Sequence, residues 1–167
     1  MTLLTTDRLE LRQYTLDDAS FVLELLNTPD WMANIGDRGV RTLKDAEEYI
    51  ENKYLSQYEE FGFGSYVSVL KGTETIVGTC GLYKRPNLEH FDIGFAMLPK
   101  YERQGYAYEG SSALMSYARS ELKLQTIYGI TLPSNKPSQQ LLKKLGLDVI
   151  DTIQLEEDKA DLLLFST

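Results

Sequence analysis

The sequence predicts an α+β domain with a mixed, mostly antiparallel sheet of about seven strands and four helices. Segments that alternate apolar and polar residues are interspersed with segments whose apolar residues recur every three or four positions. Three of the alternating segments follow one another across short turns. The chain has 167 residues, 43% hydrophobic and 25% charged, which suits one buried core, so we expect residues 1–167 to form a single domain.

The first strand and helix are expected near the start of the chain. Residues 9–14 alternate apolar and polar side chains, the period of a half-buried strand. Thr15 and Asp18 then form a capping-box pattern, which predicts a helix through about residue 26. Pro29 is expected to end that helix, because the residue before proline avoids the helical conformation.

A second helix is expected at residues 42–58, because Thr42 and Asp45 repeat the capping pattern and a glycine break follows at Gly62. The next three elements read as an antiparallel meander of strands joined by short turns. These strands are expected at residues 65–70, 75–83 and 91–98.

The last third of the chain reads as helix, strand, helix and hairpin. Apolar residues recur at helical spacing after Gly105, and a leucine stripe precedes Gly146, which is expected to stop the final helix. The expected elements are a helix at about 106–122, a strand at 126–132, a helix at 136–145 and hairpin strands at 149–155 and 160–165.

Composition excludes several classes of protein. The formal charge is −8, and no basic block is longer than two residues, so a nucleic-acid-binding surface is not expected. Cys80 and His90 are the single cysteine and the single histidine, which argues against a disulfide or a zinc site. No run of about 20 apolar residues and no secretory leader is recognisable, so we expect a cytoplasmic protein without a membrane segment or metal.

The most informative segment runs from residue 92 to residue 110. It reads as a strand, a polar loop containing Gly105, and a helix. A junction of this kind directs free backbone N–H groups and the positive end of a helix dipole at one point, where a phosphate group can bind. The alternative is an ordinary connection in which Gly105 only permits the turn.

Three motifs in this chain resemble those of the GNAT N-acetyltransferases. Gln104 to Glu109 (Gln-Gly-Tyr-Ala-Tyr-Glu) is similar to the family motif that holds the pyrophosphate of acetyl-CoA. Residues 135–147 resemble the N-x-x-S-x-x-L-x-x-K-L-G-F motif further along. Residues 6–12 and 17–19 are similar to the start of the RimJ/RimL branch, and together the motifs cover nearly the whole chain.

The resemblance implies a GNAT-like fold and a set of residues around acetyl-CoA. A backbone N–H near residues 96–98 would polarise the thioester carbonyl if the strand separates from its neighbour at a bulge. The expected contacts of acetyl-CoA are Ala96, Met97, Leu98, Arg103, Gln104, Gly105, Tyr106, Ala107, Tyr108, Asn135 and Ser138.

Two positions depart from the family pattern. Glu102 stands where the motif has Gln or Arg, so Arg103 and backbone N–H groups are left to bind the pyrophosphate. Leu142 stands where many members have a tyrosine that protonates the departing thiolate, and that role would pass to Ser138. Asn135 has an alternative role as a helix N-cap.

Asp92 is the predicted general base, because it resembles the carboxylate that several members carry on the same strand. The alternative for Asp92 is a solvated residue at a strand end. Glu156 and Glu157 are other candidates, and His90 could act near neutral pH or be a surface residue. Cys80 is assigned to packing.

The acceptor is expected between the two N-terminal helices and the sheet. In this architecture it would lie near residues that include Asp37, whose charge could attract a cationic amine or only solvate a helix start. Trp31 and the tyrosines are assigned to packing rather than to substrate binding. The neighbourhood comprises Trp31, Asn34, Asp37, Arg38 and Tyr83, and the packing tyrosines are Tyr49, Tyr54 and Tyr58.

The resemblance therefore implies an acyltransferase that moves an acetyl group from acetyl-CoA to a primary amine, either a protein N-terminus of the ribosomal-protein type or a small molecule. The alternative is a non-catalytic sensor of acyl-CoA with the same fold. A dinucleotide-binding domain is disfavoured, because Gly105 and Gly110 do not form G-x-G-x-x-G. The protein would act as a monomer or homodimer.

Overall fold

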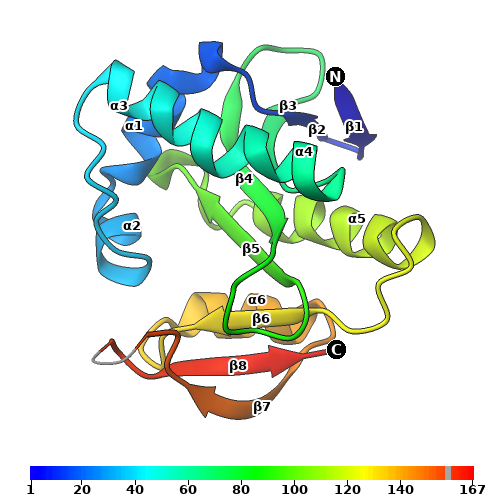
Figure 1. Ribbon diagram of the computed structural model, residues 1–167. Coiled ribbons are helices and arrows are strands. Elements are labelled where there is room, and N and C mark those ends of the chain that lie inside the picture. The colour runs from blue at the N-terminus through cyan, green and yellow to red at the C-terminus, as the bar shows by residue number, and fades with distance from the viewer. Residues whose placement is uncertain (157–158) are drawn as a thin grey trace.

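In the computed structural model, which describes residues 1–156 and 159–167, the strands form one sheet in the order β1-β2-β3-β4-β5-β6-β8-β7 (Figure 1). Neighbouring strands are antiparallel except β5 and β6, which are parallel. This confirms the predicted mixed, mostly antiparallel sheet. The strands are β1 (Thr2–Thr5), β2 (Leu9–Gln13), β3 (Ser65–Leu70), β4 (Ile76–Tyr83), β5 (Asp92–Met97), β6 (Tyr128–Thr131), β7 (Asp148–Ile153) and β8 (Leu162–Ser166).

The helices are short except for α5, and within the described part of the chain none is long and apolar enough to span a bilayer. The α-helices are α1 (Ala19–Leu26), α2 (Pro29–Asn34), α3 (Leu43–Tyr49), α4 (Ser56–Phe61), α5 (Tyr106–Ser120) and α6 (Lys136–Lys144). Single turns of other helix types are η1 (Leu16–Asp18), η2 (Ile50–Leu55) and η3 (Pro99–Tyr101), of which η2 is a π-helix.

Two elements were not predicted, strand β1 and helix α2. Pro29 does not only follow helix α1 but also begins helix α2, at the first helical position. Proline is tolerated there because the N–H it lacks would have no partner inside the helix. The Thr28 hydroxyl caps α2 by accepting a hydrogen bond from the Trp31 N–H at 3.3 Å.

The predicted second helix is split into α3, η2 and α4. It begins as expected, because the Thr42 hydroxyl accepts from the Asp45 N–H and the Asp45 carboxylate accepts from the Thr42 N–H. The π-helical turn then inserts an extra residue into the helical path. The segment ends at Gly62, whose φ of +77° is the left-handed conformation typical of a helix end.

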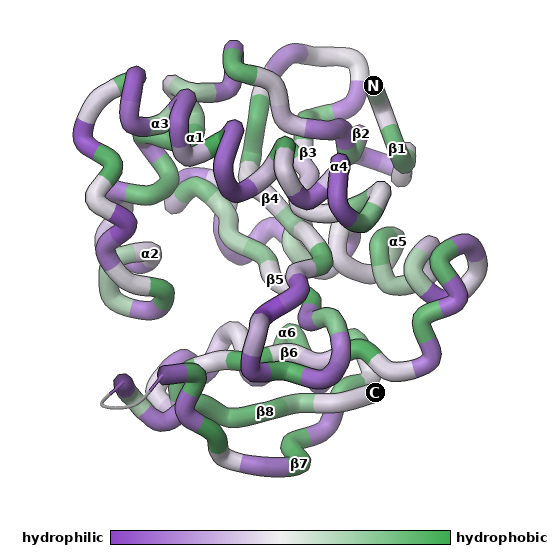
Figure 2. The backbone as a smooth tube through the Cα atoms, in the orientation of Figure 1, coloured by the Kyte–Doolittle hydropathy of each residue, from purple (hydrophilic) through white to green (hydrophobic). Residues whose placement is uncertain are grey.

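Apolar residues are buried on both faces of the sheet. Helices α1 to α3 and η2 cover one face, where Leu25, Ile50 and Leu98 are buried. Helices α5 and α6 pack against the other face, around Leu82, Leu114 and Phe165. Apolar residues along β8 are visible in Figure 2. Strand β5 therefore has a covered face on each side, which explains why it lacks the strict alternation of a half-exposed strand.

Candidate active site

Strands β5 and β6 separate almost immediately after they meet. Their parallel pairing consists of one position, Asp92 opposite Tyr128, so the rest of β5 has β4 as its only partner strand (Figure 1). The Leu98 N–H donates to the Val77 carbonyl of the β4 side at 2.9 Å. Because successive N–H groups of a strand point in opposite directions, those of Met97 and Phe95 point toward the side where β6 has diverged.

This geometry reduces the number of backbone N–H groups near residues 96–98 that could polarise a thioester carbonyl. Leu98 is excluded, because its N–H is already bound to Val77, and Ala96 shares its direction. Met97 has an N–H group in the direction that the prediction requires, and Phe95, which was not predicted, has a second one. The pairing of β5 with β4 is regular, so β5 separates from β6 without a bulge of its own. The nearest register shift lies between β3 and β4, where Val77 of β4 is the extra residue.

The loop into α5 leaves three backbone N–H groups free. Gly105 caps the helix with φ of +84°, and the first helical hydrogen bond runs from the Glu109 N–H to the Gly105 carbonyl at 3.0 Å. The N–H groups of residues 106–108 therefore precede any partner within the helix. Arg103, exposed and also with positive φ, extends the same turn. This arrangement has the N–H groups and dipole that an anionic phosphate needs.

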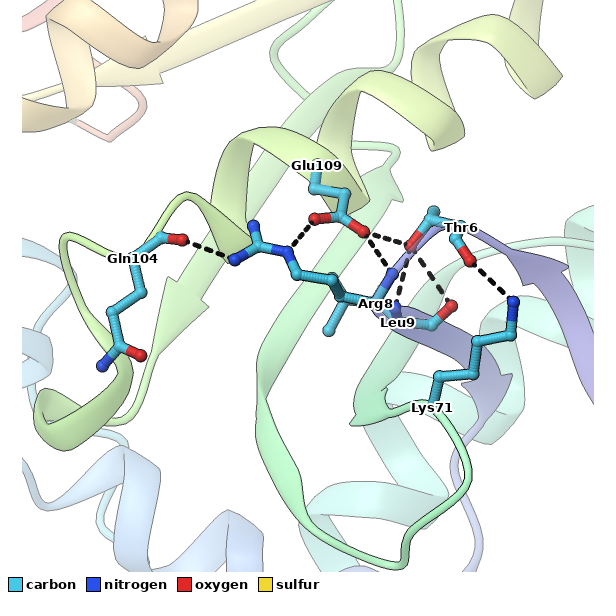
Figure 3. A network of polar contacts seen from close by, with 6 residues as sticks. All are labelled: Thr6, Arg8, Leu9, Lys71, Gln104 and Glu109. Carbon is cyan, nitrogen blue, oxygen red and sulfur yellow. Dashed lines mark hydrogen bonds and ion pairs between the residues drawn. The ribbon is translucent and has the colours of Figure 1, made fainter.

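Arg8 joins this loop to the start of β2 (Figure 3). Its Nε donates to Glu109 Oε2 at 2.7 Å, and its Nη1 donates to the Gln104 carbonyl at 3.0 Å. The guanidinium also lies 4.4 Å from the centre of the Tyr106 ring. The Thr6 hydroxyl donates to Glu109 Oε1 at 2.6 Å. Residues 6–12 were singled out only as a motif, and the structure shows that Arg8 positions the loop.

Glu102, which precedes Arg103 in the loop, lies beside Asp30 of α2. Burial raises the pKa of Glu102, and the neighbouring Asp30 carboxyl raises it further. Two carboxylates that approach each other disfavour a second ionisation. The sequence predicts that Glu102 does not help bind an anion. The second carboxyl group beside it, that of Asp30, is consistent with this prediction.

Asn135 and Ser138 lie at the start of α6. The Asn135 side chain accepts a hydrogen bond from the Ser138 N–H at 3.3 Å, so its role as an N-cap is present. The half-buried Ser138 hydroxyl has no hydrogen bond to any residue that the structure describes. Leu142 is buried against Gly129 of β6, so it belongs to the core. Lys144 lies 4.1 Å from the centre of the Tyr108 ring and connects α6 to α5.

Asp92 is buried rather than solvated, with 1% of its surface exposed, so its alternative reading as a solvated strand end is wrong. The Arg85 Nε donates to Asp92 Oδ1 at 2.8 Å, whereas Oδ2 has no partner among the described residues. Burial raises the pKa of Asp92, and Arg85 offsets only part of that effect. A carboxyl with a raised pKa and one free oxygen is chemically suited to accept a proton.

The other candidate bases differ in their surroundings, and His90 lies near Asp92 because it contacts Tyr128, the residue paired with Asp92. His90 stacks edge-on against Tyr128 at 5.0 Å between ring centres, and Glu156 is exposed. Glu157 lies outside the described residues. Cys80 is buried as predicted, and burial raises the pKa of its thiol to about 12, so it is inert at neutral pH.

The location of the acceptor stays a prediction, and the structure tests only the packing of the aromatic residues assigned to this region. Trp31 and Tyr54 are buried, as expected for packing residues. Asp37 does not have a free charge, because the Arg41 guanidinium donates to it at 2.5 Å and lowers its pKa. The expectation that Asp37 attracts a cationic amine stays a prediction, and Arg41 would compete for the same carboxylate. Of the other residues in this neighbourhood, Arg38 is exposed, whereas Asn34 and Tyr83 are partly buried. No group of three or more potential metal ligands occurs in residues 1–156 and 159–167.

The comparisons with known proteins agree with this geometry. A sequence profile of the acetyltransferase (GNAT) domain matches residues 8–148. The uncharacterized N-acetyltransferase YnaD of Bacillus subtilis is 28% identical over 144 residues, which cover 86% of this chain and 81% of that protein.

Two solved structures share the fold at low identity. One is an acetyl transferase of Salmonella typhimurium that modifies the N-terminal serine of a 50S ribosomal subunit protein, with a TM-score of 0.79 and 13% identity over 97% of this chain and 95% of that one. The other is spermidine N-acetyltransferase of Vibrio cholerae in complex with CoA and spermine, with a TM-score of 0.77 and 15% identity over 95% and 94%. With the profile spanning most of its length, the chain belongs to the GNAT family of acetyltransferases.

Proposed function

We propose that the protein transfers the acetyl group of acetyl-CoA to a primary amine. The observation that carries this proposal is the separation of β5 from β6, which leaves the N–H groups of Phe95 and Met97 unpaired on the strand that leads into the α5 loop. A thioester carbonyl next to either N–H would be polarised in a site from which water is largely excluded. One such donor contributes about 10²- to 10³-fold in rate.

In this proposal the α5 loop holds the pyrophosphate of acetyl-CoA through the N–H groups of residues 106–108, with Arg103 and Arg8 as the nearby cations. The amine nitrogen attacks the carbonyl carbon and the C–S bond breaks. The proton lost by the amine goes to Asp92, and the departing thiolate takes a proton from solvent or from Ser138. Asp92 lies three residues, about 10 Å, from Phe95, so the proton would travel through water.

The acceptor class remains a proposal of its own. The relatives with this fold that act on a ribosomal protein and on spermidine show that one scaffold serves different amines. A cytoplasmic location, the RimJ/RimL branch and action as a monomer or homodimer also stay predictions.

A second candidate is a sensor that binds acyl-CoA without turnover. It is favoured by Glu102 beside Asp30 and by Leu142 at the position of the family tyrosine. Both candidates predict that acetyl-CoA raises the midpoint of heat unfolding and that NADH does not. Release of free thiol from acetyl-CoA in the presence of a panel of amines separates them. Binding without thiol release for any amine would reject the enzyme and leave the sensor.

A further inference from the structure

Two surface hollows lie on either side of the π-helical turn η2. Their volumes are about 430 and 260 Å³, and Asn52 and Lys53 line both. π-helical turns are rare and occur frequently at functional sites, because the extra residue redirects side chains without ending the helix. Here the turn places the side chains of two polar residues between the hollows. This juxtaposition makes the region a candidate for ligand binding that is separate from the α5 loop.

The larger hollow has an excess of positive charge. Lys53, Lys84 and Arg85 line it, against the single acidic residue Glu60. The turn between β4 and β5, which contributes Lys84 and Arg85, is largely hydrophilic in Figure 2. The chain as a whole has a formal charge of −8, so a local excess of cations is contrary to its overall composition. A cationic ligand would be repelled at this hollow, and an anionic group would be attracted.

Arg85 connects the hollow to the proposed base. Its Nε donates to Asp92 Oδ1 at 2.8 Å, and its side chain remains 32% exposed. Nη1 and Nη2 of Arg85 form no hydrogen bond with another residue of the described chain. A guanidinium presents two parallel N–H groups that match the two oxygens of a carboxylate. The free side of Arg85 is therefore suited to bind a carboxylate.

The two neighbouring lysines add to this capacity. The Lys84 ammonium donates to the carbonyls of Leu88 and Glu89, which accounts for two of its three N–H groups. Lys53 is exposed and has no ion pair with another described residue. On the other side of Arg85, Asp92 Oδ2 is buried and unpartnered. A carboxyl oxygen that can accept a proton, Asp92 Oδ2, thus lies close to a cluster of hydrogen-bond donors that could bind a carboxylate.

We propose that this hollow binds the carboxylate of the acetyl acceptor, with Arg85 and Lys53 as its partners, while the acceptor's amine lies between the hollow and the N–H groups of Phe95 and Met97 and passes its proton to Asp92 through water. The acceptor is then an amine of the amino-acid class, in which a carboxylate lies a few bonds from the amine. This inference rests on the proposed acetyltransferase function and specifies its substrate. A polyamine, by contrast, would place a second positive charge against Lys53, Lys84 and Arg85.

The test compares acceptors that differ only in the carboxylate. Thiol release from acetyl-CoA is measured with glycine, β-alanine and 4-aminobutanoate, with the amide of each, and with 1,4-diaminobutane. Glycylglycine and glycylglycinamide form a further pair that distinguishes a peptide from a free amino acid as the source of the carboxylate. We expect kcat/KM for at least one acid to exceed that of its amide by on the order of tenfold, the usual worth of a hydrogen bond to a charged group.

Lys53→Gln supplies the matched variant, because Lys53 is exposed and makes no contact on which folding depends. It should lower kcat/KM for the acid by on the order of tenfold and leave the amide unchanged. Lys44→Gln removes the same charge from α3, outside both hollows, and should change neither.

The outcomes distinguish this inference from the proposed function. A preference for glycylglycine over glycylglycinamide would support the same chemistry with a peptide as its source. Equal rates for acids and amides, a preference for 1,4-diaminobutane, or equal losses in Lys53→Gln and Lys44→Gln would overturn the inference while acetyl transfer stands. Absence of thiol release with every amine tested would overturn the proposed function itself.

Discussion

The loop that begins α5 and the hollow beside η2 are built in different ways. The loop consists of one continuous stretch, and most of what it offers a ligand is backbone N–H groups whose direction follows from helix geometry. The hollow is lined by side chains from η2, α4 and the β4–β5 turn, which meet only in the folded chain. Backbone groups are the same whatever the residue, whereas side chains give each hollow its own charge.

This difference teaches how one family can keep a cofactor and change an acceptor. A phosphate site made of backbone N–H groups tolerates substitution at most positions other than Gly105. A site made of Lys53, Lys84 and Arg85 changes character with one mutation. The four predictions below test that contrast, in order of decreasing expected effect.

Asp92→Asn should have the largest effect. It removes the proton acceptor on the acceptor side, so kcat should fall by about 100-fold or more, while acetyl-CoA binding is retained. Because the pKa of Asp92 is raised, the parent enzyme should lose activity as acidification protonates this carboxyl. The variant should recover partly at high pH, where more of the amine is deprotonated. Asp148→Asn on the exposed strand β7 is the control.

Steady-state kinetics from pH 5 to 10, together with the Kd of acetyl-CoA, measure this. Turnover close to that of the parent protein would mean that the base is another group or water, and the exposed Glu156 would be tested next.

Gly105→Val should weaken the cofactor side. A side chain at φ of +84° is strained, and its Cβ would lie 3.2 Å from Nη2 of Arg8, whose Nη1 donates to the Gln104 carbonyl of the loop. Acetyl-CoA affinity should fall by on the order of tenfold, since the strain of about 1–2 kcal/mol is relieved by moving the loop. Gly72→Val is the control, because its φ is +73° and it lies in open space in the β3–β4 turn.

Both valine variants should lose similar stability in denaturant unfolding, but only Gly105→Val should lose affinity in a calorimetric titration with acetyl-CoA. Equal affinity in the two folded variants would remove the pyrophosphate assignment.

Glu109→Gln tests the one part of the loop that depends on distant side chains. Glu109 is partly buried, which alone would raise its pKa, but hydrogen bonds from Thr6 and Arg8 outweigh this and lower it. A lowered pKa in the folded state adds stability that is complete above about pH 5 and is lost as the pH falls through the folded pKa. The variant should therefore be less stable by about 1.5 kcal/mol at pH 7, and by progressively less on acidification.

Urea unfolding at pH 7, 5 and 3 measures this difference, with the exposed Glu121→Gln, just beyond the end of the same helix, as the control. A loss of stability in Glu109→Gln that does not change with pH would show that the ion pair with Arg8 is not its cause.

Asn135→Ala should have the smallest effect. Loss of the hydrogen bond to the Ser138 N–H should cost about 1 kcal/mol of stability, and Asn135→Ser should restore most of it, because serine is also a good N-cap. If capping is the whole role of Asn135, the KM for acetyl-CoA should stay within about twofold of the parent value. A rise in that KM with unchanged melting temperature would instead assign Asn135 to the cofactor.

Sequence reasoning succeeded where the signal was local. The strands other than β1, the cap at Thr42 and the helix after Gly105 depend on periodicity and on neighbouring residues, and they were predicted close to their observed positions. Pro29 was correctly expected to follow the end of α1, but its second role at the start of α2 was missed, because proline is compatible with both positions. The π-helical turn has no sequence pattern of its own, so the predicted second helix was continuous.

The site was predictable on the same terms. Gly105 and the residues after it could be identified from one stretch of sequence, but the choice between the N–H groups of Met97 and Leu98 depends on the register of β4 and β5. The contact of Arg8 with Glu109 joins residues 101 positions apart. The pairing of Arg85 with Asp92 spans a turn, and its closeness to Lys53 depends on how η2 packs.

The early separation of β5 and β6 has a consequence for solvent exchange of backbone amides. The amide protons of Phe95 and Met97 lie within a folded sheet, yet they lack the partner strand that slows exchange at Leu98. They should therefore exchange with deuterium in heavy water faster than the amides of β5 that face β4. A molecule that fills the space and accepts hydrogen bonds from them would slow that exchange, so the protein backbone itself would report when the site is occupied.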